Sequence, residues 1–199
     1  YNILSTVILS GINFMTIPLF TRLLGAEQYG LYSVFHSWVT IVMCFIALEC
    51  RSGLGTARYT FADKYNEYKS SSLMMGLIAG MACIFMAAVF RNQLSRLIGY
   101  PPFIIVLIFV SALAYHLIEF AKGSFIYEKK AEKNFILSVS LAILTVALSL
   151  FFLKYGWFDD KYLARVYGDT LPYLIVALVI IAFVFKEASP RYNKEYWRY

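Results

Sequence analysis

Long apolar runs separated by short polar connectors organise this sequence of 199 residues. A helix of roughly 20 apolar residues spans the hydrocarbon core of a bilayer, which is about 30 Å thick. Six runs reach that length, and the connectors between them are too short to fold as separate domains. The pattern therefore predicts an all-α fold, a polytopic membrane helix bundle with six transmembrane helices, at 2–21, 30–50, 72–90, 102–121, 135–153 and 163–185.

Composition supports burial in lipid. Hydrophobic residues make up 60% of the chain and charged residues only 15%, whereas soluble domains are roughly half apolar and about a quarter charged. The net charge of +6 comes from Lys and Arg between apolar runs, where basic residues anchor helices and contact lipid head groups. We expect membrane lipid as a partner and no nucleic acid. Cys44, Cys50 and Cys83 show no metal-binding or disulfide spacing.

The distribution of basic residues predicts the orientation in the membrane, because Lys and Arg accumulate on the cytoplasmic side. Six occupy one set of alternate connectors: Arg22, Arg91, Arg96, Lys154, Lys161 and Arg165. Twelve occupy the other set and the tail: Arg51, Arg58, Lys64, Lys69, Lys122, Lys129, Lys130, Lys133, Lys186, Arg191, Lys194 and Arg198. We therefore expect both ends of this chain in the cytoplasm.

The first apolar run carries a polar stripe. At 100° per residue, its polar residues fall within a sector about 100° wide. The stripe either lines a lumen or makes hydrogen bonds between packed helices. Pro18 removes one backbone donor, which can kink a spanning helix and open a cavity. The stripe consists of Asn2, Ser5, Thr6, Asn13 and Thr16.

Two further runs are read from their small and apolar residues. Gly76 and Gly80 form a GxxxG motif, which is typical of closely packed membrane helices. The almost unbroken apolar run at 141–153 indicates a helix that faces lipid or fills space in the bundle.

Ionisable residues in spanning helices need a reason, because each costs roughly 2.5–3.5 kcal/mol on insertion scales. At the cytoplasmic ends we expect Glu119 to lie near Arg51, since pairing reduces the cost of both charges. His36 is either a hydrogen-bonded core residue or a lumen residue. Snorkelling and structural ion pairs are the alternative explanation for the others. The candidates for gating or ion coupling are Glu49, His116, Glu119, Arg165 and Asp169.

Enzymatic motifs are missing from the sequence. It contains no HxxxxD spacing, no DxD at a helix end, no P-loop and no GxSxG. We therefore expect a protein that is not an enzyme, with no catalytic residues, no cofactor and no metal site.

Three segments resemble one family of membrane proteins. They are Ile17-Pro-Leu-Phe-Thr-Arg-Leu-Leu-Gly25 with Glu27-Gln-Tyr-Gly-Leu-Tyr32, then Gly53-Leu-Gly-Thr-Ala-Arg58, and the closing Lys194-Glu-Tyr-Trp-Arg-Tyr199. These segments are similar to signatures of the Wzx-type polysaccharide flippases, which share a superfamily with MATE multidrug exporters and the lipid II flippase. The helix number and order match over the whole chain, and the residue-level match is specific in the first 60 positions and the last few.

The resemblance implies one lobe of a two-lobed MATE-like transporter. Residues 1–185 would form the first six-helix lobe, and residues 186–199 a cytoplasmic connector toward a second lobe. The implied function is flipping of an undecaprenyl-pyrophosphate-linked oligosaccharide across the bacterial inner membrane, with the pyrophosphate in a cationic cavity. Arg22, Arg51 and Arg58 match arginines of related signatures. With Asn13 and Thr16 they are the candidate residues for substrate binding and translocation.

Two other functions stay open at this point. One is a cation-coupled exporter of small molecules on the same fold, whose cavity would carry acidic and aromatic residues in place of arginines. The other is a membrane scaffold that recruits polymerases or glycosyltransferases without transporting anything. The expected partners are the lipid-linked oligosaccharide and membrane lipid, and the polysaccharide polymerase is a further candidate.

Reporter fusions test the predicted orientation. Fusions placed after Asp160 and after Glu195 are expected to report opposite sides of the membrane, because a single spanning helix separates the two positions. Alkaline phosphatase activity for the first fusion and green fluorescence for the second would support the positive-inside assignment. Two fusions on the same side would overturn the six-helix map.

Overall fold

Helices and short turns make up the described part of the chain. The computed structural model describes residues 2–47, 50–189 and 196, without the side chains of residues 2–6, 13, 47 and 50–52. Among these residues, six helices are long and apolar enough to cross a membrane, so the six-helix prediction is confirmed. They are α1 (Asn2–Leu24), α2 (Ala26–Ala47), α4 (Tyr65–Val89), α6 (Pro102–Tyr127), α7 (Ala131–Tyr155) and α8 (Lys161–Glu187).

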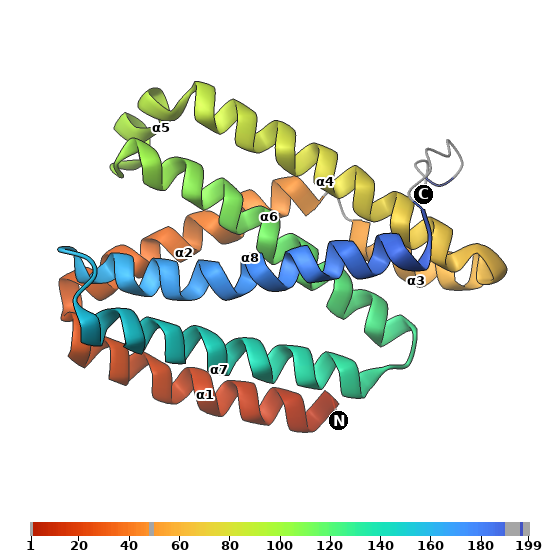
Figure 1. The fold of residues 1–199 in the computed structure, drawn as a ribbon, viewed down its shortest axis with the longest axis horizontal. Coiled ribbons are helices and arrows are strands. Elements are labelled where there is room, and N and C mark those ends of the chain that lie inside the picture. The colour runs from red at the N-terminus through yellow and green to blue at the C-terminus, as the bar shows by residue number, and fades with distance from the viewer. Residues whose placement is uncertain (1, 48–49, 190–195, 197–199) are drawn as a thin grey trace.

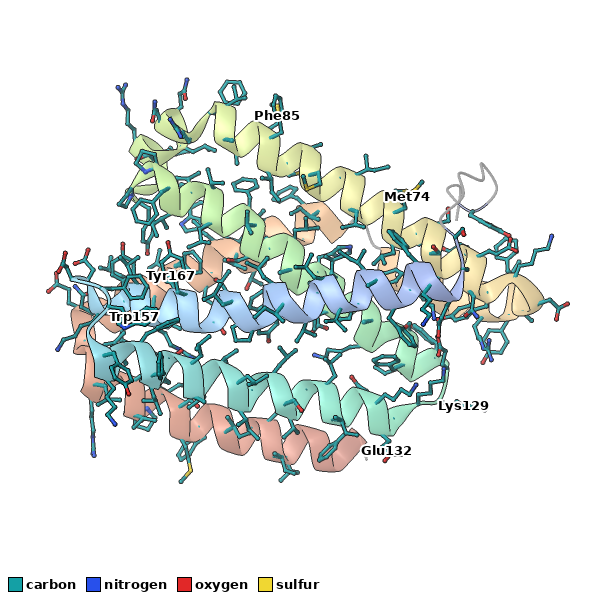
Figure 2. All side chains as sticks on the ribbon, in the orientation of Figure 1. Met74, Phe85, Lys129, Glu132, Trp157 and Tyr167 are labelled. Carbon is teal, nitrogen blue, oxygen red and sulfur yellow. The ribbon has the colours of Figure 1, made fainter. Side chains whose placement is uncertain are left out.

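The long helices run side by side, so the bundle has two ends (Figure 1). The α3 end carries α3 (Cys50–Thr60), the α6–α7 turn and the end of α8, and the α5 end carries α5 (Arg91–Ile98) with the α1–α2 and α7–α8 turns. The labelled side chains follow this division: Lys129 and Glu132 lie at the α3 end, and Trp157 and Tyr167 near the α5 end (Figure 2). Phe85 on α4 points away from the bundle, as expected for a side chain that faces lipid.

Glycine residues allow two of the tight turns at the α5 end. Gly25 separates α1 from α2 with a φ of +87°, and Gly156 ends α7 with a φ of +60°. These left-handed conformations suit glycine, which has no Cβ to clash with the preceding carbonyl. Helix α1 continues through Pro18.

Helix α6 is the centre of the bundle. It packs against α2, α3, α4, α5, α7 and α8, and 61% of its apolar span is buried, against 12% of the α1 span. The α4–α6 contact depends on the GxxxG motif. A Cβ at Gly76 would lie 2.6 Å from His116 Nε2, and a Cβ at Gly80 would lie 2.4 Å from Leu113 Cδ1. The structure thus confirms that this motif permits close packing.

Helix α7 exposes Ile143, Leu144 and Phe151, as the lipid-facing interpretation of the run at 141–153 predicts, but it also has a buried face with hydroxyl groups. Its buried side chains follow helical spacing: Ser138, Leu141, Thr145, Ser149 and Phe152. This face meets α8 so closely that a Cβ at Gly168 would lie 2.6 Å from the Cα of Ser149. Most residues of α7 are apolar, but three buried hydroxyl residues share one face of the helix: Ser138, Thr145 and Ser149.

The short helix α3 was not predicted as an element separate from the second span. Leu54 and Ala57 are buried at its contact with the bundle, and Gly55 approaches Tyr127 at the end of α6 so closely that a Cβ would lie 2.8 Å from the ring. These residues belong to the Gly53–Arg58 segment that resembles the flippase signature. The segment therefore includes a packing contact at the α3 end.

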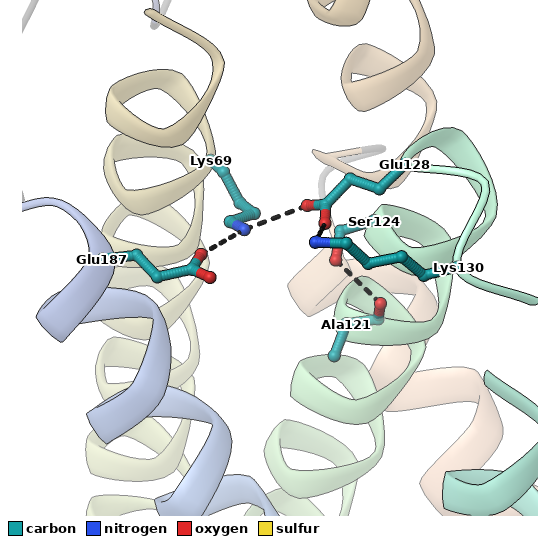
Figure 3. Close-up of polar contacts among 6 residues, drawn as sticks. All are labelled: Lys69, Ala121, Ser124, Glu128, Lys130 and Glu187. Atoms are coloured by element: carbon teal, nitrogen blue, oxygen red, sulfur yellow. Dashed lines mark hydrogen bonds and ion pairs between the residues drawn. The ribbon is translucent and has the colours of Figure 1, made fainter. Parts of the chain in front are cut away.

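A buried cluster of charges joins three elements at the α3 end (Figure 3). The ammonium of Lys69 on α4 lies 3.0 Å from Glu128 in the α6–α7 turn and 2.6 Å from Glu187 at the end of α8. Lys130 forms a second ion pair with Glu128. Burial alone would raise the pKa of Glu128, but hydrogen bonds from Lys130 and Lys69 lower it below its ordinary value. The sequence pattern predicts Lys69 only as a basic residue of a connector.

Removing Lys69 tests how much this cluster stabilises the bundle. Lys69→Met keeps most of the side-chain volume but leaves two carboxylates without their shared cation, so we expect the free energy of unfolding to fall by about 3–5 kcal/mol. Lys130→Met is the matched control: its side chain is 44% exposed, and exposed pairs contribute about 1 kcal/mol or less. Denaturation in detergent micelles measures both variants, and equal losses would contradict the prediction.

The lowered pKa of Glu128 also sets the pH range of this effect. A carboxyl whose pKa is lowered by folding stabilises fully above its ordinary pKa, about 4.5 for Glu, and loses that contribution as the pH falls through the lowered value. The difference between wild type and Lys69→Met is therefore expected at pH 7 and should shrink at pH values well below 4.5.

Candidate functional site

Two cavities between the helices share part of their lining. The central cavity has a volume of about 290 Å³ and is lined from α1, α2, α6, α7 and α8. The α1–α2 cavity has a volume of about 340 Å³ and lies between α1, α2 and α8. Both are lined by Tyr32, His36 and Arg165. A cavity lined by charges inside an apolar bundle is the strongest candidate for a functional site in the described part of the chain.

The carboxylate of Asp169 links three helices in the central cavity. Asp169 lies on α8 and is 6% exposed. Its Oδ2 accepts hydrogen bonds from the hydroxyl of Tyr32 on α2 at 3.0 Å and from the hydroxyl of Tyr115 on α6 at 2.6 Å. Hydrogen bonds to an ionised group are stronger than those between neutral groups. These bonds therefore stabilise a buried negative charge that would otherwise be costly.

Arg165 lies one helical turn before Asp169 and is held by α7. Its Nη1 donates to Ser149 Oγ at 2.9 Å and to the backbone oxygen of Thr145 at 3.3 Å. The guanidinium carbon also lies 4.3 Å from the ring centroid of Phe20 and 5.0 Å from that of Tyr32. Cation–π contacts of this kind stabilise a cation that is removed from water.

Arg165 and Asp169 share the central cavity but bind different parts of the bundle. Both charges line the central cavity, as expected for residues four positions apart on one helix. Their hydrogen bonds, however, go to different neighbours: Asp169 binds tyrosines of α2 and α6, and Arg165 binds α7. Each charge thus connects α8 to a different part of the bundle.

Aromatic rings form one wall of the central cavity. The rings of Tyr115 and Tyr173 stack in parallel, with centroids 3.9 Å apart and an interplanar angle of 4°. His36 meets Tyr115 edge to face at 5.8 Å. The side chain of His36 therefore lies among aromatic neighbours and lines both cavities.

Two other predicted residues lie at or beside the cavities. Thr16, from the polar stripe of α1, lines the α1–α2 cavity, and its hydroxyl donates to the backbone oxygen of Ile12 at 2.6 Å. Glu119 accepts from Lys122 at 2.6 Å, and Lys122 lines the central cavity. Polar groups thus extend along α6 from Tyr115 toward the α3 end.

Three predicted site residues lie away from the cavities. His116 is buried where α6 crosses Gly76 of α4, and its Nε2 has no hydrogen-bond partner among the described residues. Arg22 is exposed near the end of α1. Arg58 is exposed on α3, with its guanidinium 5.0 Å from the ring centroid of Tyr65.

The remaining predicted residues are outside the described part of the structure. Glu49 is not described, and neither are the side chains of Arg51 and Asn13. The expected approach of Glu119 to Arg51 therefore stays a prediction. Among the residues that are described, no group of three or more His, Cys, Asp or Glu is placed to hold a metal ion.

The tyrosines that complete the site are not predicted from the sequence. Tyr32 closes the Glu27–Tyr32 segment, which had been used only as a family signature, and Tyr115 and Tyr173 lie within apolar runs. Gln28 of the same segment also binds α8, since its Oε1 accepts from the backbone N–H of Tyr162 at 3.1 Å. Gln28 and Tyr32 are four residues apart, a spacing that could have indicated one polar face of α2.

The six-helix bundle and its internal charged cavity define a polytopic membrane protein with a polar intramembrane site. A family model described as "Polysaccharide biosynthesis protein" matches residues 1–196. The chain therefore belongs to this family, which is the family of Wzx-type polysaccharide flippases and MATE-like transporters. Searches of curated proteins and of solved structures found no match.

Proposed function

We propose that this protein flips undecaprenyl-pyrophosphate-linked oligosaccharide from the inner to the outer leaflet of the bacterial inner membrane. Membership of the polysaccharide biosynthesis family supports a membrane transporter of polysaccharide precursors. The observation that carries the proposal is the pair of buried charges, Arg165 and Asp169, in a cavity between five spanning helices. A helix bundle that only anchored other proteins would have no need for such charges, which are expensive in lipid.

Alternating access is the mechanism that such a bundle supports best. In two-lobed transporters, the lobes rock around a site near the middle of the membrane. We propose that these six helices form the first lobe, with Thr16 and Asn13 on the face of α1 that borders the transport path. Asp169, which is hydrogen-bonded to Tyr32, and the Glu119–Lys122 ion pair can exchange partners as the lobe changes state. Glu49 and His116 stay candidates for the same role.

A cation-coupled exporter of small molecules is the second candidate. That function predicts acidic and aromatic residues in the cavity, and Asp169 lies there beside Tyr32, Tyr115 and Tyr173. The same cavity contains Arg165. Its positive charge attracts an anionic substrate and repels a cationic drug. The charge composition thus favours the flippase over the exporter.

The experiment that tests the function follows the lipid-linked sugar. In a strain that lacks this protein, lipid-linked oligosaccharide is expected to accumulate with its sugars facing the cytoplasm, where an added probe outside the cell cannot reach them. Expressing the protein should expose the sugars on the outer side. If the precursor is exposed equally in both strains while export of a dye changes, the exporter is supported. If both are unchanged and only polymer assembly fails, a scaffold is supported.

Arg22 provides a residue-level prediction for this function. A phosphate group that leaves water needs fixed cations to replace its hydration, and the planar fork of arginine can hold two phosphate oxygens. We expect Arg22→Ala to reduce export of the oligosaccharide sharply, and Arg22→Lys to restore it only in part. Surface polysaccharide is the readout, with the amount of protein in the membrane as the control. Full export by Arg22→Ala would show that this exposed arginine is only an interfacial anchor.

A further inference from the structure

A cavity with apolar walls lies among α1, α7 and α8 at the α5 end of the bundle. Its volume is about 480 Å³, larger than that of the central or the α1–α2 cavity, and it shares no lining residue with either of them. Three spanning helices end or begin there, since α1 ends at Leu24, α7 ends at Tyr155 and α8 begins at Lys161. The apolar lining residues are Leu23, Leu150, Phe152, Leu153, Phe158 and Ala164.

Exposed aromatic residues indicate the level of this cavity in the membrane. Tyr155 and Trp157, at the end of α7 and in the turn that follows, are 59% and 63% exposed, and Figure 2 shows Trp157 near the α5 end. Exposed Trp and Tyr side chains concentrate at the interface between membrane and water. The cavity therefore lies at the level of the lipid head groups, with Leu150 and Leu153 on the side of the hydrocarbon core.

Charged side chains of both signs line the same cavity. Lys154 and Lys161 supply two ammonium groups and Asp159 supplies a carboxylate, and all three residues are exposed. In the described part of the chain, no ion pair joins Asp159 to either lysine. The three charges are therefore free to bind a ligand that carries a phosphate and an ammonium group side by side. A purely anionic head group would meet the carboxylate as well as the lysines, and like charges repel.

The aromatic rings of the lining argue against a quaternary ammonium ligand, which is typically recognised by rings that enclose the cation. Phe152 and Phe158 instead pack edge to face against each other, with centroids 5.7 Å apart. The ring of Phe158 is also stacked on Tyr167 at 5.0 Å, which covers one of its faces. Asp159 suits a primary ammonium, because such a group has three N–H donors for a carboxylate and a quaternary ammonium has none.

From these observations we propose that the cavity among α1, α7 and α8 binds phosphatidylethanolamine from the membrane leaflet at the α5 end. The phosphate pairs with Lys154 and Lys161, and the ammonium pairs with Asp159. The first part of an acyl chain packs against Leu150 and Leu153. Exposed ion pairs contribute little by themselves, but the burial of apolar surface adds to them. The ligand is an ordinary membrane phospholipid, so the proposal does not depend on the proposed function.

Lipid titrations of the full chain in detergent micelles, followed by native mass spectrometry, test this site. Three probes with the same acyl chains are compared: phosphatidylethanolamine, phosphatidylcholine and phosphatidylglycerol. We expect wild type to bind phosphatidylethanolamine most tightly. Asp159→Asn should weaken that binding by about twofold to fivefold, the range for an exposed ion pair, and should abolish the preference over phosphatidylcholine.

The matched control is Asp63→Asn at the α3 end. Asp63 is also exposed and lines a cavity together with Lys64, but no large apolar residue lines that cavity. This variant should leave the affinities for all three lipids unchanged. A second test replaces both lysines at once, Lys154→Gln with Lys161→Gln, and should weaken the binding of all three lipids because each of them carries a phosphate.

A preference for phosphatidylethanolamine that is lost in Asp159→Asn and kept in Asp63→Asn supports the proposal. Equal binding of the three lipids by wild type, or tighter binding of phosphatidylcholine or phosphatidylglycerol, overturns it. So does a preference that survives in Asp159→Asn, that is lost equally in Asp63→Asn, or a double lysine variant with unchanged affinities. Unfolding temperatures show which variants are folded, and the lysine variant decides if Asp159→Asn is not.

Discussion

A polar group inside the bundle is stabilised chiefly by partners within the protein, because the hydrocarbon core offers no water. Asp169 shows how far this constraint shapes the structure. Its carboxylate accepts from hydroxyls on α2 and α6, so the burial of one charge fixes the relative positions of three helices. Arg165 extends the same arrangement to α7 through Ser149. The packing of the bundle and the chemistry of the cavity therefore depend on the same two residues of α8.

The two ends of the bundle use charge differently. At the α3 end, Lys69 is bound by two carboxylates, which leaves the cluster satisfied within itself and suited to holding α4, the α6–α7 turn and α8 together. In the cavities, by contrast, the Nε of Arg165 has no partner among the described residues. A fully satisfied buried network makes the structure around it rigid, whereas an unpaired buried donor is costly. This difference separates the structural charges of the chain from its candidate functional charges.

How much of the fold and of the site could be predicted from the sequence depends on how far apart along the chain the interacting residues lie. Helix lengths follow from the thickness of the membrane, and the contact of Gly76 and Gly80 with α6 follows from a local motif, so both were predicted. The pairing of Lys69 with Glu128 joins residues 59 positions apart, and the bond from Tyr32 to Asp169 joins residues 137 positions apart. No periodicity within one helix carries that information. The polar face of α7 was visible in principle, since Ser138, Thr145 and Ser149 repeat at helical spacing.

Tyr32 contacts both charged residues of the site. Its hydroxyl is bound to Asp169 and its ring lies 5.0 Å from the guanidinium carbon of Arg165. Any movement of α2 that breaks the hydrogen bond to Asp169 also shifts the ring that covers Arg165. Tyr32, which lines both cavities, thus couples the position of α2 to both charged residues of α8.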